Sequence, residues 1–347
     1  MKHAVLSLVV SLLLTQSPAF AQWQPQVIGT DANFRAVSVA GAEIVWIVGT
    51  KGTFVRSADG GRTWQTGTVP DALTCDFRDV QAIDAQTAYL MSAGPAEKGQ
   101  ARIYKTTDGG QTWSLLYQTQ QVGVFLDGID FWDKEHGIVF GDPPTDVAVN
   151  NKWFILTTDD AGRTWQPVPE AALPAMQPGE AAFAASGTSL VVQGKRNVWI
   201  ASGGAKSGRV FRSGDRGRTW AVSTTPLPAG EATGLFGMQF FSAKVGFVVG
   251  GNYKQEQQPG PNAAITRDGG QTWQVASPTN PPGLKEAVAL LPGDRLLVVG
   301  PSGTSLSADQ GQTWQALDSE RHHSVACAKG TCYAVGAKGK VSKRTFR

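Results

Sequence analysis

Short apolar runs recur along the chain, and each ends in a turn rich in glycine and polar residues. Three segments show the pattern clearly: VWIVGTKGTFVRSADGG, LLVVGPSGTSLSADQG and the tail CYAVGAKGKVSKR. Each reads as an apolar strand, a glycine turn and a second strand. A further strand lies upstream, in the sequences FRAVSV, FRDVQAI, LDGIDF, FGMQFF, EAVALL and HSVACA. Short runs bounded by turn residues predict β-strands rather than helices.

An eight-residue box, [ST]-x-D-x-G-x-T-W, follows these strands and occurs six times. The copies are Ser57–Trp64, Thr106–Trp113, Thr158–Trp165, Ser213–Trp220, Thr266–Trp273 and Ser307–Trp314. Their final tryptophans are 49, 52, 55, 53 and 41 residues apart. One repeat therefore contains strands A, B and C, the box, and strand D. Four antiparallel strands in a repeat of about 50 residues predict one blade of a β-propeller.

The two ends of the chain indicate how the ring of blades closes. The last repeat stops at Arg347 without a box or a strand D, whereas QWQPQ near the N-terminus matches the segments that follow a box, such as TWQTG and TWQPV. We therefore predict an all-β, seven-bladed propeller over residues 22–347, with the N-terminal strand completing the last blade. Such closure hides the sheet edges that an open array would expose.

The box has the composition of a hairpin joint between strands C and D. Its aspartate and its Ser or Thr can hydrogen-bond to their own turn, and its glycine permits a positive φ. Its tryptophan offers a large apolar surface to pack between sheets. A catalytic role would need an equivalent active site in every blade, so we interpret the box as structural. Its aspartates are Asp59, Asp108, Asp160, Asp215, Asp268 and Asp309.

The repeat resembles the Asp-box, also called the bacterial neuraminidase repeat. With the VG..G turns before the boxes, the chain is similar to the photosystem II stability and assembly factor family of seven-bladed propellers, and to relatives of that family in non-photosynthetic bacteria. The resemblance implies a propeller over nearly the whole mature chain and a role in assembling or stabilising an envelope complex. Asp-boxes also occur in sialidases, other glycosidases and sortilin-type receptors, so the box alone does not assign a function.

Composition and charge exclude several classes of function. The chain has 41 glycines, 11 tryptophans and only 17% charged residues, which suits short strands joined by tight turns. A net charge of +3 without a long basic run argues against a nucleic-acid partner. We expect no cofactor, because no G-x-G-x-x-G follows a strand and opens a helix, and the residues do not support an oxidoreductase. We expect no metal site either, since the adjacent His322 and His323 would point to opposite faces of a strand.

The first residues predict export. Residues 1–21 combine a basic start, the apolar run AVLSLVVSLLL and the sequence AFA at 19–21, the pattern of a cleavable signal peptide. We therefore expect a soluble, monomeric, periplasmic or secreted protein with no membrane span. An oxidising compartment permits disulfides. Cys327 and Cys332 flank a tight turn and are predicted to pair, which leaves Cys75 as a buried apolar residue.

Function is expected on the face opposite the boxes, where the B-to-C and D-to-A connections lie. The B-to-C loops of blades 1, 6 and 7 are minimal, whereas those of blades 2 to 5 are longer: Ser92–Gln100, Gly141–Lys152, Ser202–Gly208 and Gly250–Asn262. Long loops gathered on one arc of one face indicate a binding surface, with neutral loop drift as the alternative.

The start of each inner strand should ring the mouth of the central channel. Aligned inner strands place Arg35, Arg78, Asp127, Ala184, Phe236, Glu286 and His323 in equivalent positions. The candidate binding residues are Arg35, Arg78, Asp127, Asp142, Glu180, Glu286 and His323. Two adjacent arginines could clamp an anion or a peptide carboxylate. The alternative is that these charges only solvate one another.

Catalysis remains an open alternative at this stage. A sialidase, by its family's pattern, would place a Tyr–Glu pair and three arginines on this face, but none of the five tyrosines begins an inner strand and FRAV lacks the Ile-Pro ending. Another glycosidase would need two carboxylates at a defined separation, for which Asp127, Asp142, Glu180 and Glu286 are candidates. We favour a non-catalytic module that binds a protein or an extended peptide, with a glycoside hydrolase or glycan-binding protein as the alternative.

Overall fold

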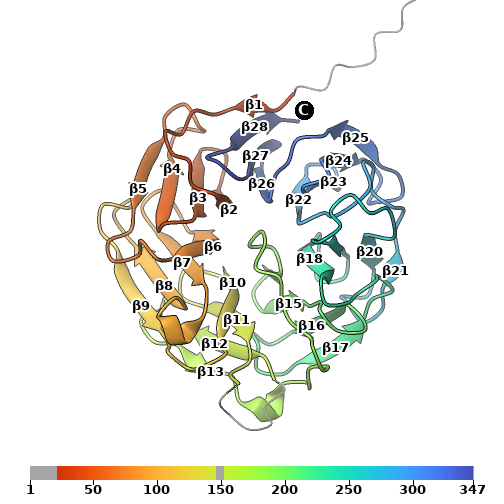
Figure 1. Cartoon of the computed structure of the whole chain (residues 1–347), viewed down its shortest axis with the longest axis horizontal. Helices are drawn as coiled ribbons and strands as arrows, with labels where there is room; N and C mark the ends of the chain where they lie inside the picture. Colours follow the sequence, from red (N-terminus) through yellow and green to blue (C-terminus); the bar gives the residue numbers. More distant parts are fainter. Residues whose placement is uncertain (1–21, 146–151, 347) are drawn as a thin grey trace, which may run out of the picture.

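The computed structural model describes residues 22–145 and 152–346, and within them seven four-stranded antiparallel sheets stand in a ring (Figure 1). In blades 1 to 6 the four strands follow chain order from the centre of the ring outward. The predicted all-β, seven-bladed propeller is therefore confirmed. The predicted signal peptide, residues 1–21, lies outside the described residues.

The strand bounds are as follows. Blade 1 contains β2 (Phe34–Ala40), β3 (Ile44–Gly49), β4 (Thr53–Ser57) and β5 (Gln65–Thr68). Blade 2 contains β6 (Asp76–Ala82), β7 (Ala88–Ala93), β8 (Arg102–Thr106) and β9 (Ser114–Gln118). Blade 3 contains β10 (Phe125–Phe131), β11 (Gly137–Asp142), β12 (Phe154–Thr158) and β13 (Gln166–Pro167). Blade 4 contains β14 (Leu190–Gln193), β15 (Asn197–Ala201), β16 (Arg209–Ser213) and β17 (Ala221–Thr224).

Blade 5 contains β18 (Thr233–Phe240), β19 (Gly246–Asn252), β20 (Ala263–Thr266) and β21 (Gln274–Val275). Blade 6 contains β22 (Ala287–Leu291), β23 (Arg295–Val299), β24 (Thr304–Ser307) and β25 (Gln315–Asp318). Blade 7 contains β26 (Ser324–Ala328), β27 (Thr331–Val335), β28 (Val341–Thr345) and β1 (Gln24–Pro25). The helices of the described residues are two short 3-10 turns, η1 (Ala96–Lys98) and η2 (Glu170–Ala172), and neither could span a bilayer.

Blade 7 closes the ring with strands from both ends of the chain. Gln24 of β1 pairs with Lys343 of β28, and Pro25 pairs with Ser342, in an antiparallel register. The predicted completion of the last blade by the N-terminal strand is therefore confirmed. This arrangement joins the two chain ends through backbone hydrogen bonds, so the ring has no gap between its first and last blades.

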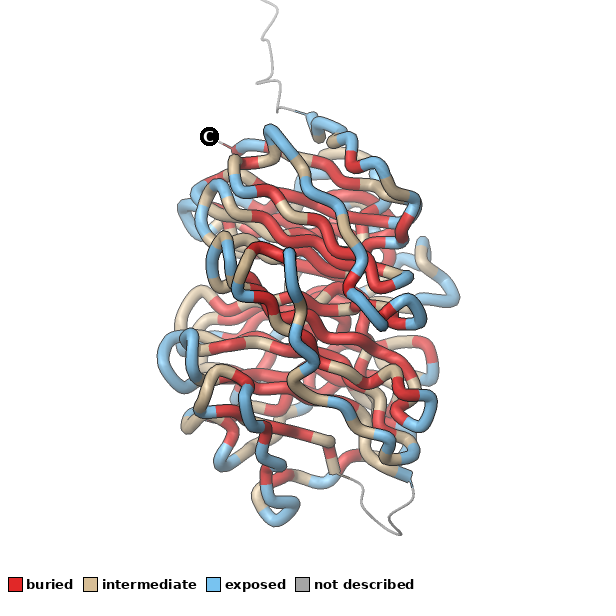
Figure 2. The backbone as a smooth tube through the Cα atoms, turned by 90° about the vertical axis from the view of Figure 1, so that its left-hand side faces the viewer, coloured by how far each residue is buried: buried red, intermediate tan, exposed pale blue. Residues whose placement is uncertain are grey.

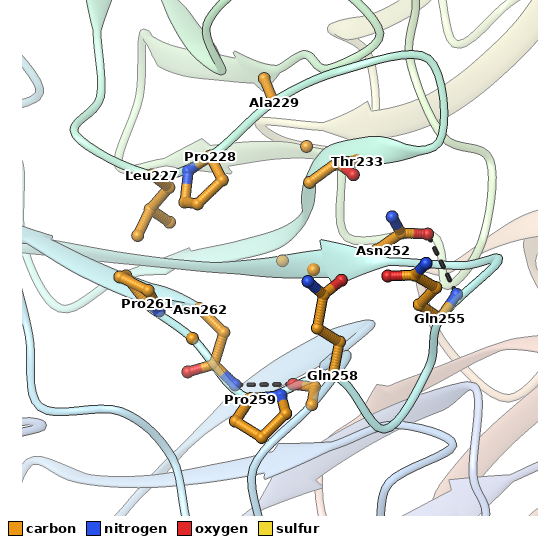
Figure 3. Close-up of a pocket in the computed structure, with 15 residues that line it drawn as sticks. Leu227, Pro228, Ala229, Thr233, Asn252, Gln255, Gln258, Pro259, Pro261 and Asn262 are labelled. Carbon is orange, nitrogen blue, oxygen red and sulfur yellow. Dashed lines mark hydrogen bonds between the residues drawn. The ribbon is translucent and has the colours of Figure 1, made fainter.

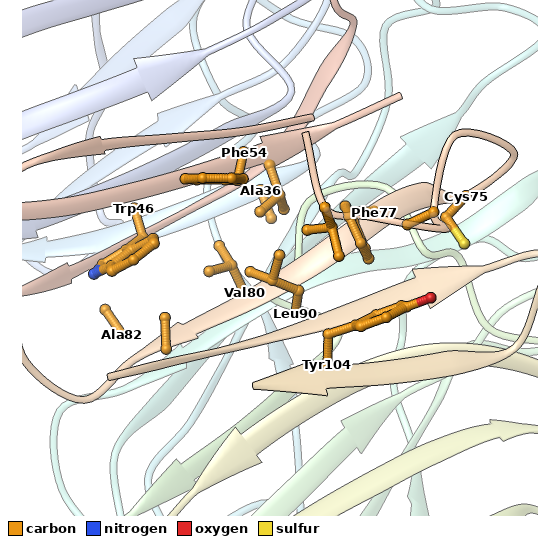
Figure 4. Packing of buried hydrophobic residues seen from close by; sticks show 13 residues of the cluster. Ala36, Trp46, Phe54, Cys75, Phe77, Val80, Ala82, Leu90 and Tyr104 are labelled. Carbon is orange, nitrogen blue, oxygen red and sulfur yellow. The ribbon is translucent and has the colours of Figure 1, made fainter. Parts of the chain in front are cut away.

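The core lies between neighbouring blades, where strands are covered on both faces (Figure 2). Trp46 and Phe54 of blade 1 pack with Phe77 and Leu90 of blade 2 in one such cluster (Figure 4). The box tryptophan of blade 2, Trp113, adds to this layer, with its ring centroid 5.1 Å from that of Phe54. Other box tryptophans also pack against the preceding blade, as in Trp64 with Tyr333, Trp165 in the cluster of Tyr89, Trp273 in the cluster of Trp199, and Trp314 with Phe247.

Each box folds into the same hydrogen-bonded turn. In the first box the Ser57 hydroxyl donates to the Asp59 carboxylate (2.9 Å) and accepts from the Gly61 N–H (2.8 Å). The other Asp59 oxygen accepts from the Thr63 hydroxyl at 2.6 Å, and the Thr63 N–H also donates to this carboxylate. The equivalent bonds form in the other five boxes. These aspartates are thus occupied in holding the turn.

The cysteines occupy two different environments. Cys327 and Cys332 form a disulfide across the turn between β26 and β27. Cys75 is free and buried, with 1% of its surface exposed, in the core cluster between blades 1 and 2. A buried thiol in apolar surroundings behaves as a small apolar side chain rather than as a nucleophile.

Candidate functional site

The box turns lie on one face of the ring, and the loops that differ in length between blades lie on the other. In five blades the box turn is hydrogen-bonded to the A-to-B turn of the same blade, as between the Gly60 N–H and the Glu43 carbonyl (2.9 Å). Successive antiparallel strands run in opposite directions, so the B-to-C and D-to-A connections lie at the opposite end. We call this end the loop face.

A β-bulge near the start of the inner strand occurs at four of the aligned positions. The register of the inner strand shifts between Phe34 and Ala36 in blade 1, and equivalent shifts occur in blades 2, 3 and 5. The residues inside these shifts are Arg35, Arg78, Asp127 and Phe236. A bulge residue is freed from the ladder and its side chain is re-aimed. These are four of the seven positions that the strand alignment gave as equivalent.

Blade 4 departs from that alignment, because Ala184 does not belong to an inner strand. The inner strand, β14, begins at Leu190, and the stretch before it passes across the channel, where a green loop reaches the middle of the ring in Figure 1. The Ala184 carbonyl accepts from Arg78 of blade 2 (2.9 Å). The Ser186 hydroxyl donates to the Glu286 carbonyl of blade 6 (2.8 Å). We call residues 181–188 the crossing segment.

Further bonds fix the crossing segment against the ring. Ser324 of blade 7 donates to the Ser186 carbonyl (2.7 Å), and the Met238 N–H of blade 5 donates to the Thr188 carbonyl (2.9 Å). At Gly187, where φ is +72°, a Cβ atom would lie 2.4 Å from the Asp79 carboxylate, so only glycine fits there. Contacts to several blades hold this segment in one place.

The crossing segment and the inner strands enclose a cavity of about 430 Å³ at the channel mouth. Four of the candidate binding residues line it, namely Arg35, Arg78, Glu286 and His323. The remaining lining residues are Phe125, Ala182, Phe183, Ala184, Ala185, Phe236, Tyr253 and Glu256. We call it the mouth cavity. Its lining does not include the other three candidates, Asp127, Asp142 and Glu180.

The two arginines of the mouth cavity differ in how well they are satisfied. Arg78 donates to the Asp76 carboxylate at 2.7 Å and to the Ala184 carbonyl. Arg35 has a buried Nε with no hydrogen-bond partner among the described residues. Burial lowers the pKa of Arg35, and repulsion by Arg78 lowers it further, against the attraction of Glu286 and Asp76. Arg35 thus carries a positive charge with spare donors.

His323 and Glu286 are hydrogen-bonded to each other, and this bond leaves His323 unable to accept a hydrogen bond from Arg35. The His323 Nδ1 lies 2.6 Å from a Glu286 carboxylate oxygen and 3.5 Å from the Arg35 Nη1. A ring nitrogen that donates its hydrogen to a carboxylate has no lone pair left to accept from a guanidinium. The contact between Arg35 and His323 is therefore not a second hydrogen bond, and the guanidinium remains incompletely paired.

Asp127 is buried, at 1% exposure, and does not line the mouth cavity. Neither of its carboxylate oxygens has a hydrogen-bond partner among the described residues. Burial raises the pKa of Asp127 well above its usual value, and the nearby charge of Asp142 raises it further. Burial also raises the pKa of Asp142 to about 6, although its carboxylate accepts from the Ala182 N–H (3.3 Å). Burial and the mutual repulsion of the two carboxylates therefore disfavour two negative charges at this place.

Glu180 is occupied within blade 4. Its carboxylate forms a two-point ion pair with Arg209 and accepts from the Ser202 hydroxyl at 2.6 Å and the Gln177 N–H at 2.7 Å. The Glu180 side chain has no exposed surface. With its lone pairs used by these donors, Glu180 anchors the start of the crossing segment instead of facing a ligand.

A second cavity, of about 440 Å³, opens on the loop face beside blade 5 (Figure 3). The amides of Asn252, Gln255 and Gln258 border it on one side, and Pro228 lies across from them. Thr233 lies next to Asn252, with which it pairs. None of its lining residues is charged. The loop that forms it, Gly250–Asn262, also contributes Tyr253 and Glu256 to the mouth cavity. The two cavities are thus separated by a single loop.

The sequence did not indicate the crossing segment with its Phe183, nor the position of Tyr253 from the Gly250–Asn262 loop at the mouth cavity. One signal was present: the spacing of 55 residues from Trp165 to Trp220 is the longest between successive boxes. The extra length lies in the connection from β13 to β14. Within residues 22–145 and 152–346, no three His, Cys, Asp or Glu side chains gather in a way that could hold a metal ion.

Comparison with known proteins finds a family model that matches part of the chain. The model is the photosynthesis system II assembly factor YCF48, which matches residues 15–168. The photosystem II assembly protein Ycf48 of Synechococcus sp. (strain JA-2-3B'a(2-13)) is 24% identical over 280 residues, which cover 59% of this chain and 78% of that protein. The photosystem II assembly lipoprotein Ycf48 of Picosynechococcus sp. (strain ATCC 27264 / PCC 7002 / PR-6) is 23% identical over 312 residues, covering 78% of this chain and 83% of that protein.

Among solved structures, one described as YCF48 bound to D1 peptide superposes on this chain with a TM-score of 0.67. The two are 19% identical, and the superposition covers 94% of this chain and 98% of the other. At this identity the likeness establishes a common fold, and the function has to be argued from the site.

Proposed function

We propose that this chain, which resembles the photosystem II assembly factors in sequence and in fold, is a non-catalytic propeller that binds a protein partner through the loop face. An anionic group of the partner, either a C-terminal carboxylate or an acidic side chain, docks on Arg35 and Arg78. The partner is a subunit of an envelope complex that the chain helps to assemble or stabilise.

The observation that carries the proposal is the incompletely paired guanidinium of Arg35. A buried donor without an acceptor destabilises a fold by about 1 to 3 kcal/mol. An anion entering the mouth cavity would pair with the Arg35 guanidinium, which lines it, and Arg78 beside it adds a second positive charge. Charge-assisted bonds of this kind are about twice as strong as neutral ones. A group that costs stability in the free protein and gains a partner in a complex is typical of a binding site.

The loops around the mouth cavity suit a protein partner. The Gly250–Asn262 loop is held by a bond from the Leu284 N–H to the Glu256 carbonyl (2.8 Å) and by an ion pair between Glu256 and Arg321 (2.6 Å). A loop fixed in this way loses little conformational freedom when a partner binds. Two neighbouring cavities offer a segment of the partner more contacts than the mouth alone.

The carboxylates of the mouth favour binding over glycoside hydrolysis. A glycosidase needs an acid and a second carboxylate that both reach the sugar. Asp127 is 1% exposed, Glu180 is bound to Arg209, and Glu286 is bound to His323. Asp142 accepts from the Ala182 N–H and is not among the residues that line the mouth cavity. No two of the four carboxylates are both unpaired and open to the mouth cavity, so we do not extend the proposal to a glycosidase.

The proposal includes export to the periplasm or beyond. It rests on the signal-peptide pattern of residues 1–21, and a disulfide between Cys327 and Cys332 suits an oxidising compartment. The relative from Picosynechococcus is named a lipoprotein, which agrees with a role at an envelope membrane for that protein. We place this chain in the same setting, as a monomer.

Site-specific photocrosslinking in the native cell envelope tests the proposal. A photoreactive residue replaces Gln258, which is exposed on the loop face, and in a matched strain it replaces Arg62, which is exposed in a box turn. We expect a discrete protein adduct from position 258 only. The adduct should be lost when Arg35 and Arg78 are both changed to Met. Adducts from position 62 alone, or adducts that persist without the arginines, would refute the docking surface.

A further inference from the structure

Three aromatic rings line the mouth cavity next to the arginines. The ring of Phe183 in the crossing segment stacks on that of Phe236, with centroids 4.4 Å apart and planes at 14°. Tyr253 from the blade 5 loop stands edge-on to Phe183, with centroids 5.8 Å apart and planes at 72°. Three separate segments of the chain therefore place their rings in one group. We call this group the aromatic corner.

The aromatic corner is only partly covered. Phe236 is 2% exposed and anchors the group to the core, whereas Phe183 is half-buried and Tyr253 is 44% exposed. A single exposed tyrosine is ordinary on a protein surface. This one borders a cavity, stands edge-on to the half-buried ring of Phe183, and shares that cavity with Arg35. Aromatic pairs prefer stacked or edge-on contacts, and the corner offers both to an incoming ring.

The backbone presents Tyr253 in a fixed position. Its N–H donates to the Ala232 carbonyl (3.1 Å), and the Asn252 side chain accepts from the next two N–H groups, those of Lys254 (2.8 Å) and Gln255 (3.1 Å). Figure 3 shows the Asn252 amide turned toward Gln255. Tyrosine has few rotatable bonds, so a ring held at its backbone binds with a small loss of entropy. The corner is thus formed before any ligand arrives.

We infer that the mouth cavity recognises a peptide C-terminus whose last residue is aromatic, with its carboxylate on Arg35 and its ring in the aromatic corner. The inference rests on the proposed function and names the chemistry of its ligand. A volume of about 430 Å³ is at the small end for a ligand cavity, so it suits one or two residues rather than a folded surface. A C-terminal residue carries a charge and a side chain on the same Cα, which matches an arginine and an apolar corner in one small cavity.

Titration of the full mature chain with synthetic hexapeptides tests this inference. Four peptides share the sequence Gly-Ser-Gly-Ser-Gly and end in Phe with a free carboxylate, Ala with a free carboxylate, Phe amide, or Glu amide. We expect the Phe acid to bind at least tenfold more tightly than the Ala acid, which corresponds to about 1.4 kcal/mol. We also expect the Phe amide to bind at least tenfold more weakly than the Phe acid. Tighter binding of the Glu amide than of the Phe acid would assign the charge to a side chain instead and overturn the inference.

Variants separate the corner from the arginines. Tyr253→Ser should remove most of the Phe-over-Ala preference, Tyr253→Phe should keep it, and Leu115→Ser should change nothing, because Leu115 is similarly exposed (48%) but lies on β9 at the outside of blade 2. Equal binding of the Phe and Ala acids, abolished by Arg35→Met, would overturn the aromatic inference and leave the proposed anion site standing. Binding that is insensitive to Arg35→Met would refute the anion site itself.

Discussion

Changing Arg35 to methionine should stabilise the fold while it weakens anion binding. The Arg35 Nε is buried without a partner among the described residues, and Arg78 lowers the pKa of Arg35 by repulsion. Methionine keeps an unbranched apolar stem of similar shape, so most of the packing of the arginine stem is retained. Glu286 keeps its bond to His323 in the variant. The change therefore removes an unsatisfied charge and little else.

The size of the effect follows from two opposing contributions. Relief of a buried, unpaired donor stabilises by about 1 to 3 kcal/mol. Loss of the attraction to Glu286 and Asp76, and incomplete filling by methionine, offset about half of that. We expect a net gain of about 1 kcal/mol, or about 2 °C in Tm for a domain of this size. Affinity for a peptide carboxylate should fall at least tenfold in the same variant.

Urea unfolding at pH 7 measures the stability term, with Arg62→Met as the matched control. Arg62 is exposed in a box turn on the opposite face, so its substitution should change the free energy of unfolding by less than about 0.5 kcal/mol. Equal m-values across the three proteins are required for the comparison. If Arg35→Met proves less stable than the parent by more than about 1 kcal/mol, Arg35 is a structural residue and the reasoning fails.

Three other substitutions test the electrostatics of the fold. Burial lowers the pKa of Lys285 to about 7, so between pH 7 and 10 the unfolded chain binds a proton that the native chain lacks. The free energy of unfolding should therefore rise by up to about 4 kcal/mol over this range. Urea unfolding of Lys285→Met should show no such rise with pH. Burial raises the pKa of Asp127, so the native chain holds a proton that the unfolded chain releases, and the wild type loses stability as pH rises above about 4. Asp127→Asn removes this titration, so its Tm should exceed that of the wild type at pH 8 but not at pH 4. Burial raises the pKa of Asp215, but the hydrogen bonds of its box lower this pKa by more, so the contribution of Asp215 to stability is lost as pH falls below about 4. In urea unfolding, Asp215→Ala should lower the free energy of unfolding by about 1 to 2 kcal/mol at pH 7 and by less at pH 3.

The repeat allowed the ring to be predicted because its signals are local. Each box fixes a turn with its own side chains, and each tryptophan packs against the adjoining blade. Every repeat therefore specifies the same turn and the same contact between blades. The pairing of β1 with β28 was predictable for the same reason, since QWQPQ matches the strand that follows a box.

The candidate site was predicted only in part. Strand alignment identified Arg35 and Arg78 because both lie at the same bulge of the repeat. It failed in blade 4, where the apolar stretch around Ala184 resembles a strand but is held across the channel by bonds to distant blades. The burial of Asp127 was also missed, because alternation along a strand does not reveal which neighbours cover a side chain.

The most direct test of the account is a calorimetric titration that compares one peptide as a free C-terminal acid and as an amide. The account predicts that the wild-type chain prefers the acid at least tenfold, that Arg35→Met loses the preference, and that Arg62→Met keeps it. A wild-type chain that binds acid and amide equally well, or an Arg35→Met variant that still prefers the acid, would contradict the assignment of the mouth cavity as an anion-binding site.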